Sequence, residues 1–259
     1  MEEWEREWAA ITKGAAKELV EVAGVPLLLR VLEEYAASGI EEALVVVSPE
    51  KNDVIRAARS AAGQYSMPER IQTVIQQQPR GLADAIRLGR EFAGSDPIAV
   101  ALPDNLFLSR VPALRQVIET YDATGKNVVA LVELFPADSA RSGPTSIYPG
   151  ELFGDEYSIA AIPLKGSRSA TFDLGGRPSG FTGVGRYVFQ PEVFDAIDAV
   201  EENLAPGSEL DDVPVLARLL KAGRLTGRRI VGEFLDVGLP SGYAQANERI
   251  PSRGRATPR

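Results

Sequence analysis

Two aspartates have the placement that a metal-dependent reaction requires. Asp104 follows the apolar run 98–102, and Asp236 ends the apolar segment 226–235. In an open α/β sheet, the carboxyl ends of the strands line the crevice where ligands bind. Carboxylates delivered there from two strands predict a site for Mg²⁺, which prefers oxygen ligands and completes its shell with water or substrate phosphate. Either aspartate alone could equally begin an Asx-turn, so the prediction depends on the pair.

The absence of two residue types limits the reaction mechanisms that the protein can use. The 259 residues include no histidine and no cysteine. This excludes disulfides, thiolate zinc sites and nucleophilic mechanisms that use cysteine or a Ser–His pair. The remaining chemistry depends on carboxylates, lysines, arginines, backbone amides and an oxygen-preferring metal.

Charge and hydropathy narrow the class of partner. The formal net charge is -8, which disfavours binding to bulk nucleic acid. No apolar run approaches the roughly 20 residues that cross a bilayer, and the acidic start Met1–Trp4 is unlike a secretory signal. We therefore expect a cytoplasmic protein with no nucleic-acid or membrane partner. Residues 249–259, rich in arginine, are expected to form a disordered basic tail.

Strands and helices alternate through the first part of the sequence. Apolar runs predict strands at 43–47, 71–75, 98–102 and 127–132. Amphipathic patterns predict helices at 1–11, 26–37, 53–62, 81–92 and 112–123. This alternation is typical of an α/β fold, a three-layer sandwich around a mostly parallel, Rossmann-like sheet.

The pattern changes from about residue 142. Strand-like segments with little helix between them predict a mixed or antiparallel extension at 145–148, 158–164 and 182–189. Further helices are expected at 191–200, 212–222 and 241–248, with a strand at 226–235. There is no internal repeat or long linker, so we expect one domain over residues 1–248.

Five short motifs follow one another along the chain. They are Thr12–Leu19, Gln76–Ala85, Leu102–Asp104, Gly183–Phe189 and Leu235–Tyr243, with the short Glu209–Leu210 pair between the last two. In this order they resemble the motifs of the sugar-1-phosphate nucleotidylyltransferases, most of all the branch of bacterial UTP–glucose-1-phosphate uridylyltransferases. Each motif alone is weak evidence, and their shared order makes the resemblance specific.

The resemblance implies roles on the nucleotide side. Gln76 would hydrogen-bond the edge of a uracil or thymine base, and Gly81 would let the base approach the backbone, where a Cβ would obstruct it. Asp104 and Asp236 would hold Mg²⁺ on the nucleotide phosphates. Lys17 would place its ammonium on the same phosphates. The implied catalytic residues are therefore Lys17 and the two aspartates.

The resemblance also implies a sugar-binding side. Gly143 falls where the family has a turn against the sugar, with Ser142 in place of its Tyr, and Lys165 is the candidate to bind the sugar phosphate. The implied reaction joins a pyrimidine nucleoside triphosphate, UTP in this branch, to a sugar-1-phosphate such as glucose-1-phosphate, and releases pyrophosphate. The nucleotide-binding half would cover about 1–141 and the sugar-binding half 142–248. A homo-oligomer is compatible with the sequence.

The beginning of the sequence departs from the family. The family starts with a strand and a Gly-rich loop whose amides cradle the triphosphate. Counting back from Thr12, the glycines of that loop fall at Glu3 and Glu5 and its arginine at Glu7. We therefore expect this sequence to lack the first strand and the Gly-rich loop. Milder departures are Ala16 in place of a proline and the loss of a glutamate before Lys165.

Three interpretations follow. The sequence is a shortened form of an ordinary enzyme, a diverged enzyme that uses Arg80 or Lys13 on the triphosphate, or a catalytically silent relative that binds a nucleotide or nucleotide sugar as a sensor or partner subunit. A structural interaction module would have to use the Trp4 and Trp8 helix as its interface. Amphipathic helices usually pack on their own core, so this class is the least favoured.

Overall fold

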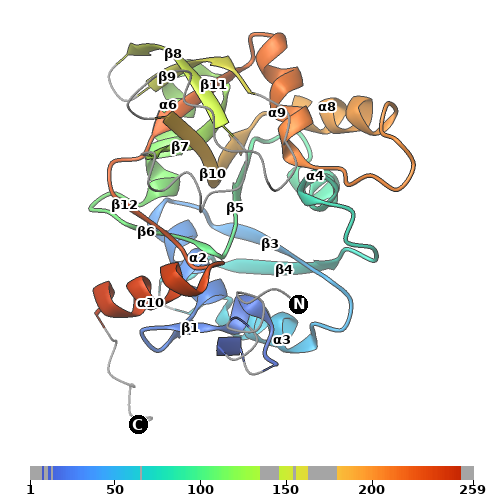
Figure 1. Ribbon diagram of the computed structural model, residues 1–259. Helices are drawn as coiled ribbons and strands as arrows, with labels where there is room; N and C mark the ends of the chain where they lie inside the picture. The colour runs from blue at the N-terminus through green and yellow to red at the C-terminus, as the bar shows by residue number, and fades with distance from the viewer. Residues whose placement is uncertain are drawn as a thin grey trace. The chain divides into compact units, whose positions relative to one another are not determined.

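The computed structural model describes residues 8, 11–12, 14–64, 66–134, 146–153, 156–162 and 180–251 (Figure 1). The chain forms two compact units, and each is assembled from separate segments. The first unit comprises Met1–Gln77, Ala101–Arg115 and Val231–Arg259, and the second comprises Gln78–Val100 and Gln116–Ile230. No described helix is long and apolar enough to cross a membrane.

The first unit contains short strand pairs flanked by helices. Its helices are η1 (Lys17–Leu19), α2 (Leu27–Ala37), α3 (Asn52–Ala61) and α10 (Pro240–Arg249). Its strands are β1 (Glu21–Val22), β2 (Val25–Pro26), β3 (Glu42–Val47), β4 (Arg70–Ile75), β6 (Asn105–Leu108) and β12 (Glu233–Asp236). Strands β3 and β4 are parallel, whereas β1–β2 and β6–β12 are antiparallel.

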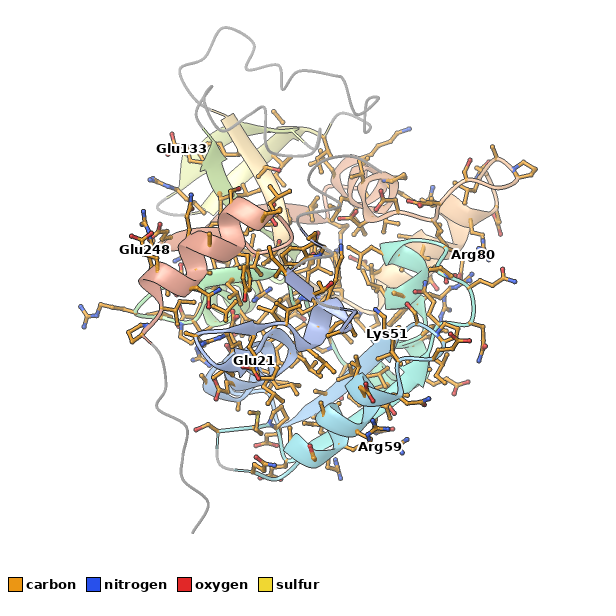
Figure 2. All side chains as sticks on the ribbon, turned by 60° about the horizontal axis from the view of Figure 1, so that its bottom comes forward. Glu21, Lys51, Arg59, Arg80, Glu133 and Glu248 are labelled. Atoms are coloured by element: carbon orange, nitrogen blue, oxygen red, sulfur yellow. The ribbon has the colours of Figure 1, made fainter. Side chains whose placement is uncertain are left out.

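Helix α3 shows how the apolar pattern builds this unit. Val54, Ala58 and Ala61 recur at helical spacing, and all three are buried. They pack in one cluster with Leu28 and Leu32 of α2, beside the β3–β4 pair. Lys51 and Arg59, both labelled in Figure 2, lie at the start of α3 and on its exposed side. The predicted amphipathic helix at 53–62 is therefore confirmed.

A second cluster lies under β6 and β12. Leu106, Leu235 and Val237 pack there with Leu27 and Ala246. Trp8 is buried, and its ring meets that of Tyr243 edge-on at 5.9 Å between centroids. Trp8 therefore packs on its own core, as expected for an amphipathic helix. Trp4 and most of the predicted helix at 1–11 lie outside the described residues.

The second unit is built on a six-stranded sheet. The strand order is β5-β10-β7-β11-β9-β8, and β8 also pairs with β10. The strands are β5 (Ile98–Ala101), β7 (Asn127–Leu134), β8 (Ser146–Phe153), β9 (Glu156–Ala161), β10 (Gly180–Phe189) and β11 (Leu225–Arg229). The helices are α4 (Leu82–Arg87), α5 (Arg90–Ala93), α8 (Glu192–Glu201) and α9 (Asp212–Lys221), with α6 (Ala113–Thr124) beginning in the first unit's segment.

The α/β class is confirmed, with a mixed sheet. Strands β7 and β11 pair in parallel, as β3 and β4 do, whereas β7–β10, β9–β11, β8–β9 and β8–β10 are antiparallel. The predicted antiparallel extension after residue 142 corresponds to β8, β9 and β10. Strand β5 is half-buried along its whole length.

Two predicted elements are each divided into two in the structure. The predicted helix 81–92 is two helices, α4 and α5, separated at Leu88–Gly89. The predicted strand 226–235 is two strands, β11 and β12, which belong to different units. At Gly232 the backbone passes so close to Ser109 that a Cβ would lie 2.7 Å from the Ser109 Cβ. Strand β6 was not predicted, because its residues directly follow a Pro-Asp turn.

Candidate active site

The β6–β12 pair brings the two predicted carboxylates together. Asp236 lies opposite Asn105 in the antiparallel register, and Leu235 lies opposite Leu106. Beyond the last strand pair, the Val237 amide donates to the Asp104 carbonyl at 2.9 Å. Residues far apart in the chain are thus fixed side by side by backbone hydrogen bonds, all within the first unit.

The side chains of both aspartates converge on Gly238. A Cβ on Gly238 would lie 3.1 Å from Asp236 Oδ1 and 3.3 Å from Asp104 Oδ2. The Gly238 amide donates to Asp236 Oδ1 at 3.1 Å, and the Asn105 side chain donates to Asp104 Oδ1 at 3.0 Å. The glycine leaves a small space that is bordered by oxygens of both carboxylates.

The electrostatics of Asp236 reflect this arrangement. The pKa of Asp236 is raised from 3.8 to about 6, mainly by burial and in addition by the nearby charge of Asp104. The Gly238 amide and Lys17 lower this pKa but do not offset the increase. Two like charges are therefore held together at a cost, which a bound cation would relieve.

Helix α10 packs against the main chain of Asp236. A Cβ on Gly242 would lie 1.8 Å from the Asp236 carbonyl oxygen, so only glycine permits this approach. The Leu239 amide also donates to that oxygen, at 3.3 Å. Pro240 begins the helix, a position where its missing amide costs no hydrogen bond. The helix therefore fixes Asp236 through the main chain and leaves its carboxylate for the site.

Lys17 lies in η1, and its side chain is exposed. Its positive charge lowers the pKa of Asp236, so its ammonium acts on that carboxylate. The next residue, Glu18, pairs with Lys51 at 2.6 Å. Ala16 has φ -61° and ψ 140°, which is the φ that a proline ring imposes. The replacement of the family's proline by Ala16 therefore keeps the backbone conformation before Lys17.

The two residues predicted to bind the base lie in different units. Gln76 follows β4, where its amide donates to the Val47 carbonyl at 2.8 Å and extends the β3–β4 pairing. Gly81 belongs to the second unit and has φ +121°. A Cβ on Gly81 would lie 2.4 Å from the Leu210 carbonyl oxygen. Gly81 is therefore required by its close packing on Leu210, which the sequence did not indicate. Its role in binding a base stays a prediction.

The remaining predicted site residues, Gly143, Lys165 and Lys13, lie outside the described residues, and their roles stay predictions. Within the described part of the chain, no group of three or more His, Cys, Asp or Glu side chains could hold a metal. The candidate metal site is thus a pair of carboxylates. That set fits Mg²⁺, which is commonly held by one or two carboxylates together with water and substrate phosphates.

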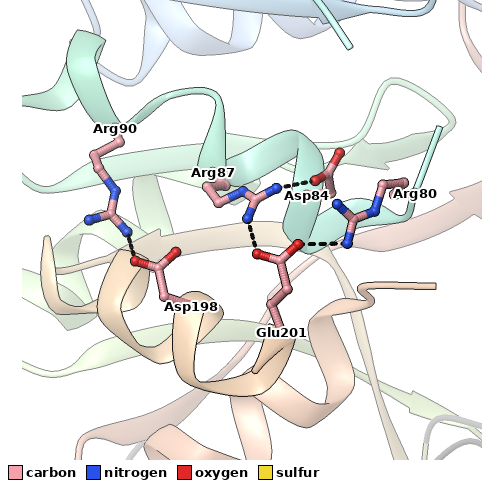
Figure 3. Close-up of polar contacts among 6 residues, drawn as sticks. All are labelled: Arg80, Asp84, Arg87, Arg90, Asp198 and Glu201. Carbon is pink, nitrogen blue, oxygen red and sulfur yellow. Dashed lines mark hydrogen bonds and ion pairs between the residues drawn. The ribbon is translucent and has the colours of Figure 1, made fainter. Parts of the chain in front are cut away.

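An ion-pair network in the second unit was missed by the sequence reasoning (Figure 3). Glu201 accepts a hydrogen bond from Arg80 at 2.6 Å and pairs with Arg87, which also donates to Asp84 at 2.7 Å. Arg80, one of the residues considered for the triphosphate, is thus engaged by a carboxylate. The signal in the sequence was the spacing of the acidic residues 195, 198 and 201 on a predicted helix.

Comparison with known proteins identifies the family of this chain. The profile of the family described as Nucleotidyl transferase matches residues 8–253. A Bacillus subtilis (strain 168) protein named "Putative UTP--glucose-1-phosphate uridylyltransferase" is 32% identical over 250 residues, 90% of this chain and 88% of that protein. UTP–glucose-1-phosphate uridylyltransferase 2 of Staphylococcus saprophyticus is 28% identical over 252 residues, 90% of this chain and 84% of that protein.

Solved structures show the same fold. A UDP-glucose pyrophosphorylase complexed with UDP-glucose matches with a TM-score of 0.77 at 23% identity, covering 95% of this chain and 94% of that one. A UTP-bound UGPase from Acinetobacter baumannii matches with a TM-score of 0.75 at 21% identity, covering 95% of this chain and 89% of that one. With the family profile spanning nearly the whole sequence, the chain belongs to the Nucleotidyl transferase family of enzymes.

Proposed function

We propose that this enzyme transfers the uridylyl group of UTP to glucose-1-phosphate, forming UDP-glucose and releasing pyrophosphate. The observation that carries the proposal is the convergence of Asp104 and Asp236 beside Gly238. The names of the relatives from Bacillus subtilis and Staphylococcus saprophyticus support UTP and glucose-1-phosphate as the substrates. The proposed partners are accordingly two small molecules, and the proposed compartment is the cytoplasm.

Asp104 and Asp236 would hold Mg²⁺ on the phosphates of UTP. The raised pKa of Asp236 supports this role, because a cation would stabilise the ionised carboxylate that burial and Asp104 disfavour. Bound Mg²⁺ would supply neutralisation of the negative charge on the transferring phosphoryl group. Lys17 would add a positive charge on the same phosphates, since its exposed ammonium acts on the Asp236 carboxylate.

The reaction balances without a covalent intermediate on the protein. A phosphate oxygen of glucose-1-phosphate attacks the α-phosphorus of UTP, the bond to the β-phosphate breaks in line, and pyrophosphate leaves with that electron pair. The protein contributes orientation and charge. The absence of histidine and cysteine from the sequence agrees with a mechanism that needs no such nucleophile.

Four residues would bind the remaining parts of the substrates. Gln76 would hydrogen-bond the uracil edge, and the backbone at Gly81 would lie against the base. Gly143 would form the turn against the sugar, and Lys165 would bind the phosphate of glucose-1-phosphate. The resemblance of the motifs around these residues supports the assignments.

The test is pyrophosphate release from UTP and glucose-1-phosphate, measured in Mg²⁺ and then in excess chelator. We expect release that requires the metal and that falls when dTTP replaces UTP or another sugar-1-phosphate replaces glucose-1-phosphate. A catalytically silent protein would instead bind UTP saturably without releasing pyrophosphate, and that outcome would contradict the proposal. The same assay with Asp236→Asn is the control for contaminating activity.

A further inference from the structure

A row of carboxylates on α8 faces three arginines of the second unit, and we call this set the arginine ladder. Glu201 pairs with Arg80 and Arg87, and Asp198 pairs with Arg90 (Figure 3). Arg90 also lies 3.7 Å from a carboxylate oxygen of Asp195 and 5.3 Å over the Phe194 ring. Because Asp195, Asp198 and Glu201 recur every three residues, they lie on one face of α8.

One end of the arginine ladder is attached to the turn that contains Gly81. Arg80 is the residue before Gly81, and its carbonyl accepts a hydrogen bond from the Leu210 amide at 2.5 Å. In return, the Leu210 carbonyl accepts from the Ala83 amide at 3.0 Å and from the Asp84 amide at 3.3 Å. Leu210 is fully buried, so these three backbone hydrogen bonds anchor the turn in the core.

We propose that Glu201 is a positioning residue for the nucleotide, which acts by holding Arg80 and Arg87 and so fixing the turn at Gly81 on which the base lies. The inference rests on the proposed function, because it takes Gly81 as part of the UTP site. Glu201 lies outside every motif that the sequence indicated. It acts through the arginines and makes no contact with substrate.

The position of Glu201 explains why it, and not its neighbours on α8, has this role. Its two carboxylate oxygens bind two different residues, Arg80 in the turn and Arg87 in α4. It therefore joins the residue before Gly81 to the helix after Gly81. Asp198 binds Arg90 in α5, beyond the turn. The hydrogen bond from Arg80 holds the pKa of Glu201 below its usual range, so the Glu201 carboxylate stays ionised at neutral pH.

The first test is the steady-state kinetics of Glu201→Gln against Asp198→Asn. Each variant removes one charge from the same face of α8, and only Glu201 contacts the turn. We expect Glu201→Gln to raise KM for UTP by about tenfold, the equivalent of one charge-assisted hydrogen bond, with kcat and KM for glucose-1-phosphate within about twofold of wild type. We expect Asp198→Asn to leave all three constants within about twofold.

Two outcomes would overturn the proposal. One is an unchanged or lower KM for UTP in Glu201→Gln, which would also be the result if Arg80, released from Glu201, bound the triphosphate directly. The other is an equal rise in KM for UTP in Asp198→Asn, which would mean that α8 acts only through general stability. If Glu201→Gln does not fold, Glu201→Asp keeps the charge on a shorter arm and should raise KM for UTP by a smaller factor.

A double-mutant cycle tests whether Glu201 acts through Arg80. Arg80→Gln should raise KM for UTP as Glu201→Gln does, and the double variant should be no worse than the poorer single variant. Additive effects would contradict the proposed mechanism. Binding of UTP to each variant by calorimetry separates this proposal from the proposed function. A wild-type protein that binds UTP without turnover refutes the function, while a tenfold weaker Glu201→Gln still supports the positioning role.

Discussion

Charge is organised in opposite ways in the two units. In the first unit, Asp104 and Asp236 are like charges held together by backbone contacts, and the pKa of Asp236 is raised to about 6. In the second unit, Glu201 lies between Arg80 and Arg87, and its pKa is lowered. A carboxylate whose charge is disfavoured is stabilised when a cation binds beside it. A carboxylate whose charge is already paired supports its neighbours, so only the first arrangement has the character of a reaction centre.

The strongest test of this comparison is Asp236→Asn. Because the carboxylate would hold Mg²⁺, we expect kcat to fall by about a thousandfold. The thermal stability of the metal-free protein should rise or stay constant, since the substitution removes a disfavoured charge without changing shape. Pyrophosphate release and a melting curve in chelator measure the two effects. A loss of stability equal to the loss of activity would show that Asp236 is structural.

The pH dependence of stability sharpens the same contrast. The folded pKa of Asp236 is about 6 against an ordinary 3.8, so the folded state binds more protons between these values. The stability contributed by protonated Asp236 is present below pH 3.8 and is lost as the pH rises through about 6, at a cost of at most about 3 kcal/mol. In chelator, the stability of Asp236→Asn minus that of wild type should therefore increase across this range. Adding Mg²⁺ should reduce the difference, and a flat difference would contradict the assignment.

The main-chain support of Asp236 is tested by Gly242→Ala. The new Cβ would lie 1.8 Å from the Asp236 carbonyl oxygen, so β12 or α10 must shift. We expect a loss of about 1–3 kcal/mol in stability by chemical denaturation, together with a clear loss of kcat. Ser241→Ala, at the exposed preceding residue, should change neither by more than about 0.5 kcal/mol. Full activity in Gly242→Ala would show that the position of Asp236 tolerates movement.

Arg87→Gln would make the second unit resemble the first. It removes one partner of Asp84, whose side chain is only 9% exposed, and one partner of Glu201. We expect a loss of about 1–2 kcal/mol at neutral pH, between the values for exposed and buried ion pairs. The loss should shrink in acid, because protonation of Asp84 and Glu201 removes the negative charges that Arg87 stabilises. Urea denaturation at two pH values measures this, and a loss that is independent of pH would point to packing alone.

Ala16→Pro is expected to have the smallest effect, and it tests the backbone conformation of the residue before Lys17. Since Ala16 already has φ -61°, a proline should fit and stabilise the protein by about 0.4–1 kcal/mol, with activity retained. Ala15→Pro is the matched control, because the Ala15 amide donates to the Thr12 carbonyl at 2.8 Å and that bond would be lost. Stabilisation by both substitutions, or by neither, would contradict this reading of the backbone.

Much of the fold could be predicted from local patterns. Helix α2 starts at Leu27, one residue after its predicted start, and β3, β4 and β7 lie within two residues of their predicted ranges. Each of these elements has an apolar pattern bounded by turn residues. The run 226–235 was misread because nothing local distinguishes one long strand from two strands that pair with different partners.

The carboxylate pair was predictable and the arginine ladder was not, for a physical reason. Asp104 and Asp236 each end an apolar segment, so the sheet topology brings them to one place. Glu201 and Arg80 meet because the chain returns after more than a hundred residues, and either side chain alone is typical of a solvated surface. The need for Gly81 likewise depends on Leu210, which local sequence does not reveal.

The segmented first unit has a consequence for biosynthesis. Both segments of the second unit, Gln78–Val100 and Gln116–Ile230, precede β12 in the chain. Since a chain emerges from the ribosome N-terminus first, the second unit can be completed while β6 still lacks its partner strand. Asp236 reaches Asp104 only when the last segment has been translated. Chains that stop before residue 231 therefore contain every residue of the second unit but lack Asp236, so the carboxylate pair forms only after the second unit has been translated.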